Sequence, residues 1–141
     1  MIEVSKKNAN VVELEIPAKP RYVGVARLIV SSLARMLDFH EESIDDLKIA
    51  ISELCTNAIV HSNDQDIEYP ITIRYSSGDD FLAVEVQDRG PGFDVSCVGR
   101  VREDGLVERG FGIPLIKSLV DDFQCTSEPE AGTCITITKF R

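Results

Sequence analysis

Apolar residues recur at helical spacing in two stretches of the first half of the chain. Between residues 21 and 37, apolar steps of three and four predict an amphipathic helix. After a polar stretch, a second apolar stripe predicts a longer helix that begins behind an N-cap at Ser43 and ends near residues 61–63. The apolar positions of this second helix are Ile44, Leu47, Ile51, Leu54 and Ala58.

Alternation of apolar and polar residues predicts strands in the rest of the chain. Residues 11–16 form one such stretch, and residues 70–87 have the pattern of a hairpin around a polar turn. A Gly-rich region then leads into a short helix over about residues 113–121. Two closing strands are expected at about residues 123–127 and 133–139.

This order of elements indicates a single α+β domain over residues 1–141. Strands and helices do not alternate one for one, which disfavours a doubly wound nucleotide-binding fold. One layer of helices on one face of a mostly antiparallel sheet is the simpler arrangement. A chain of 141 residues is long enough to bury a core without metal or disulfide staples.

The charge balance narrows the class of partner. Fifteen Lys and Arg face 24 Asp and Glu, so the formal net charge is −9, which argues against direct binding of nucleic acid. No apolar run approaches the roughly 18–20 residues of a membrane span, and the N-terminal segment lacks the apolar stretch of a signal peptide. The four cysteines have no metal-ligand spacing and are expected to be reduced. These features predict a cytoplasmic protein with no membrane association.

Candidate chemistry begins with the segment ELCTNAIVH at residues 53–61 of the second predicted helix. Glu53, Asn57 and His61 are four residues apart, so they project from one side of that helix, beside its buried stripe. A carboxylate and a carboxamide in such a place are suited to a divalent cation and a polarised water or hydroxyl. A solvated helix face has the same spacing.

A second segment, DRGPGFD at residues 88–94, directly follows a predicted strand. Its Asp88 offers a carboxylate to an exocyclic amine at the strand end. Gly90 and Gly92 allow a ligand to approach the backbone closely. A tight turn without ligand chemistry is the alternative.

A third segment, RGFGIP at residues 109–114, opens the short helix. Gly110 and Gly112 expose N–H groups where the helix dipole is positive, which suits phosphate oxygens, and Arg109 adds a charge. A plain loop–helix junction is the alternative. The chain contains neither a Walker A loop nor a GxGxxG fingerprint, so a nucleotide bound here needs a different architecture.

Together and in this order, the three segments resemble the nucleotide-binding boxes of the ATPase superfamily that includes gyrase, Hsp90, histidine kinases and MutL. The resemblance covers essentially the whole chain and is nearest to the anti-sigma-factor serine kinases of the RsbW type. It implies a Bergerat-type fold, a two-layer sandwich with helices on one face of a mixed, mostly antiparallel sheet. The segments that carry it beyond the boxes are PAKPRYVGVARLIVSSLARMLDF, IDDLKIAISELCTNAIVHS, GIPLIKSLVDDF and GTCITITKF.

The resemblance implies a phosphate side of the site. Asn57 would coordinate Mg²⁺ that bridges the ATP phosphates, and Glu53 would be the general base for the attacking hydroxyl. Gly110 and Gly112 would place N–H groups at the phosphates. Arg109 would meet the terminal phosphate, although an unpaired solvated loop is an equal alternative for that residue.

The resemblance also implies an adenine side. Asp88 would accept a hydrogen bond from the adenine amino group, and Thr133 matches a family position near the base. Gly90 and Gly92 would let the backbone close on the nucleotide. ATP and Mg²⁺ are therefore the expected cofactors.

Two protein partners follow from the same resemblance. Such a kinase holds a sigma factor inactive and phosphorylates an anti-anti-sigma antagonist on Ser or Thr, usually as a homodimer. The added phosphate would weaken the grip of the antagonist on the kinase. Two alternatives stay open: a switch kinase that phosphorylates a scaffold protein, and a non-catalytic binding module whose ATP pocket only stabilises its shape.

Overall fold

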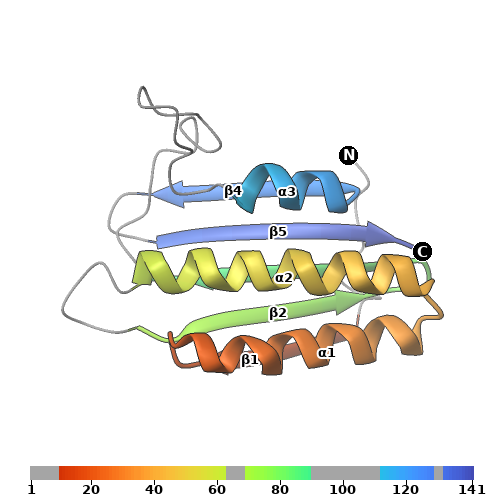
Figure 1. Ribbon diagram of the computed structural model, residues 1–141, viewed down its shortest axis with the longest axis horizontal. Helices are drawn as coiled ribbons and strands as arrows, with labels where there is room; N and C mark the ends of the chain where they lie inside the picture. The colour runs from red at the N-terminus through yellow and green to blue at the C-terminus, as the bar shows by residue number, and fades with distance from the viewer. Residues whose placement is uncertain (1–9, 63–68, 90–111, 129–131) are drawn as a thin grey trace.

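The computed structural model describes residues 10–62, 69–89, 112–128 and 132–141, with the backbone alone at residues 61, 127 and 128. Five strands form one sheet in the order β1-β2-β3-β5-β4, and every neighbouring pair is antiparallel. Figure 1 shows this sheet behind a layer of helices. The strands are β1 (Asn10–Ile16), β2 (Ile71–Ser77), β3 (Phe81–Asp88), β4 (Asp122–Glu128) and β5 (Gly132–Phe140).

The helices lie side by side on one face of the sheet (Figure 1). A single 3-10 turn, η1 (Pro20–Tyr22), leads into α1 (Val23–Met36), and α2 (Glu41–Ser62) runs antiparallel to α1 across the middle of the sheet. The short α3 (Gly112–Leu119) lies beside β4 and packs against α2. Helix α2 is therefore the central element of the layer, with contacts to both other helices and to β3.

The core forms where the apolar faces of the helices meet the inward face of the sheet. The apolar stripe predicted for α2 is buried throughout, with 4 % or less of each residue exposed. Tyr75 of β2 is also buried, and its hydroxyl donates a 2.8 Å hydrogen bond to the carbonyl oxygen of Ala26, which ties α1 to the sheet. One inward row crosses all five strands through Leu14, Ile73, Val86, Ile135 and Cys125.

The opposite face of the sheet is polar. Arg74, which lies between two buried β2 residues, points to this face and is 3.7 Å from Glu13 and 3.6 Å from Glu85. In β2, apolar inward residues thus alternate with more exposed polar residues, as expected for an antiparallel sheet with one covered face.

The sequence predictions agree with this architecture, with corrections at the helix ends. The α+β class and the layer of helices on one face of a mostly antiparallel sheet are confirmed. The N-cap at Ser43 is wrong: α2 begins at Glu41, because the N–H of Ile44 already donates to the carbonyl oxygen of His40 at 3.0 Å. The third helix ends at Leu119 rather than near residue 121. No helix in the described part of the chain is long and apolar enough to cross a membrane.

Candidate functional site

Glu53 and Asn57 lie one turn apart on α2, and both are half-buried. The inward positions Leu54 and Ala58 follow them directly in the chain and are buried, whereas Thr56 is exposed. The two polar side chains therefore stand at the edge of the buried stripe, as their spacing predicts. The third residue of the predicted triplet, His61, belongs to the same helix, but its side chain lies outside the described residues.

The carboxylate of Glu53 lies against the beginning of α3. Gly112 is the first residue of that helix and is buried. A Cβ atom added at Gly112 would meet Oε2 of Glu53, and would be 3.2 Å from Cδ and 3.3 Å from Cβ of the same side chain. The structure thus brings together two predicted site residues that are 59 positions apart in sequence.

Asp88 and Thr133 meet at the end of the central strands. Asp88 is the last residue of β3 and lies opposite Thr133 of β5 in the strand register. The backbone N–H of Thr133 donates to Oδ1 of Asp88 at 3.3 Å, and both residues are buried. Asp88 is only 3 % exposed, so this hydrogen bond offsets part of the cost of burying its carboxylate.

Sequence reasoning did not single out Gly132, which stands next to this pair. Its φ of +94° lies in the region that favours glycine. A Cβ atom there would meet the carbonyl oxygen of Asp88 and would be 2.9 Å from Cα of Arg89. In the sequence, a glycine directly before an alternating strand pattern is the signal that could have indicated this residue. The close approach of the β3 backbone to Gly132 can be recognised only in the three-dimensional structure.

The negative charge of Asp88 on β3 acts on a thiol of β4, a strand that β5 separates from β3. Burial raises the pKa of the Cys125 thiol on β4, the charge of Asp88 raises it further, and the ammonium of Lys117 on α3 lowers it. Lys117 also lies over the ring of Phe123, 5.1 Å from its centroid. Asp88 and Lys117 therefore shift the pKa of the same thiol in opposite directions.

The remaining predicted site residues lie outside the described residues. These are Gly90, Gly92, Arg109 and Gly110. The described half of the predicted site consists of Glu53, Asn57, Asp88, Gly112 and Thr133. All five belong to α2, β3, α3 or β5, elements that are neighbours in the fold.

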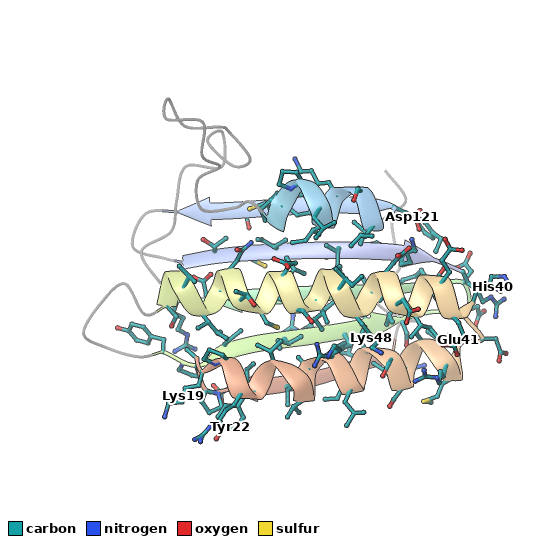
Figure 2. The ribbon with its side chains drawn as sticks, in the orientation of Figure 1. Lys19, Tyr22, His40, Glu41, Lys48 and Asp121 are labelled. Atoms are coloured by element: carbon teal, nitrogen blue, oxygen red, sulfur yellow. The ribbon has the colours of Figure 1, made fainter. Side chains whose placement is uncertain are left out.

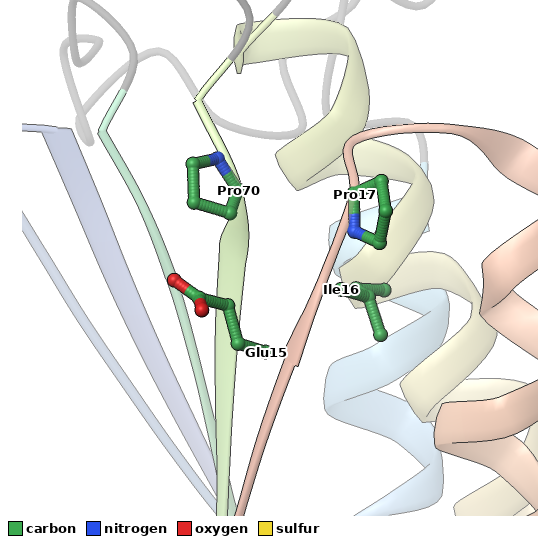
Figure 3. Close-up of a pocket in the computed structure, with 4 residues that line it drawn as sticks. All are labelled: Glu15, Ile16, Pro17 and Pro70. Carbon is green, nitrogen blue, oxygen red and sulfur yellow. The ribbon is translucent and has the colours of Figure 1, made fainter.

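An open pocket of about 320 Å³ lies elsewhere, at the end of β1. It is lined by Glu15, Ile16, Pro17 and Pro70, none of which is a predicted site residue. Figure 3 shows Ile16 pointing toward the helices while the carboxylate of Glu15 lies on the other side of the strand. The apolar lining with a single carboxylate gives no reason to assign a reaction to this pocket.

The donor set of the described residues bears on metal binding. No group of three or more His, Cys, Asp or Glu side chains that could hold a metal ion occurs among the described residues. Mg²⁺ usually takes only one or two protein ligands, and substrate phosphates and water complete its six positions. The side-chain oxygen of half-buried Asn57 fits a metal held in this way.

The comparison with protein families decides the class of this domain. Residues 16–139 match the histidine kinase-like ATPase domain, which covers every described element except β1, of which it includes only Ile16, and the last residue of β5. The chain belongs to this family. ATP binding follows from it.

Relatives of known class narrow the family further. The serine-protein kinase RsbW of Oceanobacillus iheyensis is 36% identical over 141 residues, which cover 94% of this chain and 88% of the relative. RsbW of Bacillus subtilis is 34% identical over 96% of this chain and 88% of its own length. RsbW of Listeria innocua is 36% identical over 92% and 86%. The predicted RsbW-type resemblance is confirmed, and so is the enzyme class of protein serine/threonine kinase.

Solved structures agree on the fold. The RsbU and RsbW domains of Rv1364c from Mycobacterium tuberculosis superpose with a TM-score of 0.67 at 20% identity, over 93% of this chain and 32% of that one. The histidine kinase domain of a blue-light activated histidine kinase from Erythrobacter litoralis gives a TM-score of 0.55 at 22% identity, over 88% and 61%. At these identities the likeness bears on the fold alone.

Proposed function

We propose that this protein transfers the γ-phosphoryl group of ATP to a Ser or Thr hydroxyl of an anti-anti-sigma protein, and that it binds a sigma factor to block transcription. We place this activity in the cytoplasm and assign it to a homodimer. The observation that carries the proposal is the meeting of Glu53 with the first residue of α3, in a chain related to serine-protein kinases over nearly its whole length.

In this proposal, Glu53 is the general base of the transfer. Its carboxylate takes the proton of the substrate hydroxyl, the hydroxyl oxygen forms a bond to the γ-phosphorus, and the bond from that phosphorus to the β–γ bridging oxygen breaks. The products are ADP and a phosphoprotein. Phosphoryl transfer depends mainly on positioning and charge neutralisation, so one carboxylate on a packed helix is a sufficient base.

The adenine side is proposed to depend on Asp88 and Thr133. Asp88 is buried at a strand end and can accept a hydrogen bond from the adenine amino group, which distinguishes adenine from bases that carry a carbonyl there. Thr133 fixes one oxygen of that carboxylate through its backbone N–H. The carboxylate is therefore oriented by the sheet itself.

The phosphate side is proposed to use Asn57 as the protein ligand of Mg²⁺. Bound Mg²⁺ supplies charge neutralisation at the phosphate oxygens. The N–H groups at the beginning of α3, with those of Gly110, are proposed to bind the phosphates, and Arg109 to meet the terminal phosphate. Gly90 and Gly92 are proposed to let the backbone close on the nucleotide.

The helical layer provides a surface that suits a protein partner. Helix α1 exposes Val25, Leu28 and Met36, the last two with 67% and 77% of their surface accessible. The same helix carries Arg27 and Arg35 and has no acidic residue, although the chain as a whole has a net charge of −9. We propose that this apolar and basic face of α1 binds the sigma factor through an acidic, apolar helix.

Figure 2 shows how basic groups frame this face. Lys19 and Tyr22 stand at the beginning of α1, and Lys48 of α2 lies along the seam between the two helices. At the other end of the layer, Glu41 is 3.5 Å from Arg35. Basic side chains thus occur along α1, and the one near its last residue, Arg35, is paired with Glu41.

A phosphorylation assay tests the proposal. The purified chain is incubated with ATP labelled at the γ-phosphate, Mg²⁺ and a purified anti-anti-sigma protein, and the label is traced by mass spectrometry. We expect about one label per antagonist molecule, on Ser or Thr. The antagonist with that residue changed to Ala is the control.

Other outcomes separate the alternatives. Tight binding of both partners with no label would identify a non-catalytic module. Release of inorganic phosphate without protein label would mean that water, not a protein hydroxyl, is the acceptor. Label on a scaffold protein and none on the antagonist would identify a switch kinase.

A further inference from the structure

Gly112 has two properties that can be tested separately, its backbone N–H group and its lack of a side chain. Its backbone N–H is a candidate phosphate donor at the beginning of α3, and its missing side chain leaves the space into which the Glu53 carboxylate reaches. An alanine keeps the first property and removes the second. The φ of Gly112 lies outside the left-handed region, so alanine can adopt the same backbone.

The chain offers a matched glycine without this constraint. Gly24 also lies at the beginning of a helix, α1, and is exposed. A Cβ atom added there would have a guanidinium nitrogen of Arg27 as its nearest contact, at 4.0 Å. Replacing Gly24 by alanine therefore changes helix propensity alone, whereas the same change at Gly112 also displaces Glu53.

We infer that Gly112 is a positioning residue for phosphoryl transfer, because its lack of a side chain holds the Glu53 carboxylate in the place where it can act. This inference rests on the proposed role of Glu53 as the base. It assigns to Gly112 a function beyond a backbone contact to phosphate: the space it leaves fixes where the proton acceptor stands.

The contact between residue 112 and the end of the Glu53 side chain predicts that Gly112→Ala changes the transfer rate more than the stability of the fold. The atom that a Cβ at residue 112 would meet first is the end of a flexible side chain, so Glu53 can turn away at small cost to folding. The base, however, has to stay within about 2.6–3.2 Å of the hydroxyl it deprotonates. A displacement of about 1 Å can lower such a rate by about 10²-fold.

The experiment is a double-mutant cycle of Gly112→Ala and Glu53→Ala, with Gly24→Ala as control. ATP affinity is measured by calorimetry and transfer to the anti-anti-sigma protein at saturating ATP. We expect Gly112→Ala to leave the ATP Kd within about 3-fold and to lower kcat by at least about 10-fold. In the Glu53→Ala background, the Gly112 change should lower kcat by less than about 2-fold, because there is no carboxylate left to displace. Gly24→Ala should leave both quantities at their wild-type values.

Each contrary result has a distinct meaning. If Gly112→Ala weakens ATP binding by about 10-fold or more and leaves kcat unchanged, the glycine serves the nucleotide alone and the inference is overturned. An equal loss of kcat in both backgrounds overturns it as well. If Glu53→Ala alone keeps the wild-type kcat, the proposed base is wrong and the inference falls with it, whereas a loss with Glu53→Ala but none with Gly112→Ala removes only the inference.

Failure of the single variant to fold is also informative. If Gly112→Ala does not fold but the double variant does, as judged by circular dichroism, the contact with Glu53 is the cause and the inference is supported. If neither folds, the space at residue 112 is needed for the packing of α3 rather than for Glu53, and the inference is overturned.

Discussion

At the scale of single residues, Asp88 provides the sharpest prediction. Oδ1 of Asp88 already accepts the N–H of Thr133, so an asparagine that keeps this contact turns its Nδ2 donor toward the proposed adenine amine. Two donors would then face each other in a buried place. We expect Asp88→Asn to weaken ATP binding by at least about 10-fold, the scale of a lost hydrogen bond to a charged group, measured by calorimetry.

The matched control for this change is Asp79→Asn. Asp79 is exposed in the turn between β2 and β3, at the other end of the strand that ends in Asp88. The Asp79→Asn variant should bind ATP with the affinity of the wild type. Wild-type affinity in Asp88→Asn would remove this carboxylate from the adenine side.

Residue spacing predicted the parts of the site that depend on one element. The four-residue step from Glu53 to Asn57 places both at the edge of the buried stripe of α2, as expected. The positive φ of Gly132 and its contact with the backbone of Asp88 could not be predicted in the same way. They arise from the pairing of β3 with β5, which joins Asp88 to Thr133 and Phe81 to Phe140 across long separations in the sequence.

At the scale of elements, the beginning of β5 leaves no space for a side chain at Gly132. The atoms that a Cβ at Gly132 would meet belong to the backbone of Asp88 and Arg89, which cannot move as a side chain can. With the added strain of a positive φ, we expect Gly132→Ala to lower the free energy of unfolding by about 1–3 kcal/mol, measured by urea denaturation.

Gly24→Ala is again the comparison. It places alanine in an exposed helical position with open space around it, so it should keep or raise stability by up to about 1 kcal/mol. Equal stability of the two variants would mean that the close approach of β3 to Gly132 does not constrain the fold.

The exposed face of α1 yields a prediction about partners. Leu28→Asp adds a charge to the middle of the proposed sigma-factor surface without touching the core. We expect at least about 10-fold weaker binding of the sigma factor, the scale of a hot-spot residue, with unchanged ATP affinity. Binding is measured by surface plasmon resonance.

A control on another face completes this test. Val11 is 53% exposed on β1, and its strand position points to the polar side of the sheet. Val11→Asp should bind the sigma factor as the wild type does. Equal binding by both variants would place the partner surface elsewhere than on α1.

Hydrophobic periodicity predicted every helix and strand of the described chain and the hairpin of β2 and β3, but not where each element ends or how the other strands pair. Helix α2 begins at Glu41, two residues before Ser43, because a backbone hydrogen bond to His40 rather than a side-chain cap closes its first turn. The position of β5 between β3 and β4 is a property of long-range pairing. Local sequence carries little information about either.

At the scale of the whole molecule, buried thiols and a buried phenol set the response of stability to alkaline pH. Burial raises the pKa of Cys55 from 9.0 to about 12. Burial, followed by the charge of Cys55, also raises the pKa of Tyr75 above its ordinary value of 10.0. On unfolding, both groups return to water and release protons more readily, so the native state binds more protons at high pH.

The sign of the effect follows from this difference. Below about pH 9 the Cys55 thiol is protonated in both the native and the unfolded state, so the native state keeps its full stability. As the pH rises toward 12, only the thiol of the unfolded state ionises, and the free energy of unfolding falls. For Cys55 alone, the loss between about pH 8 and about pH 10.5 is on the order of 2 kcal/mol. Urea denaturation at the two pH values measures it.

Two variants distinguish ionisation of this thiol from general alkaline weakening. Cys55→Ala has no group to ionise, so its free energy of unfolding should fall less steeply with pH than that of the wild type. Ile59→Val removes one buried methyl group from the same helix and should lower stability by about 0.5–1.5 kcal/mol at both pH values, leaving the slope unchanged. If Cys55→Ala keeps the wild-type slope, the alkaline loss comes from other groups, and the burial of Cys55 between α2 and the sheet does not govern it.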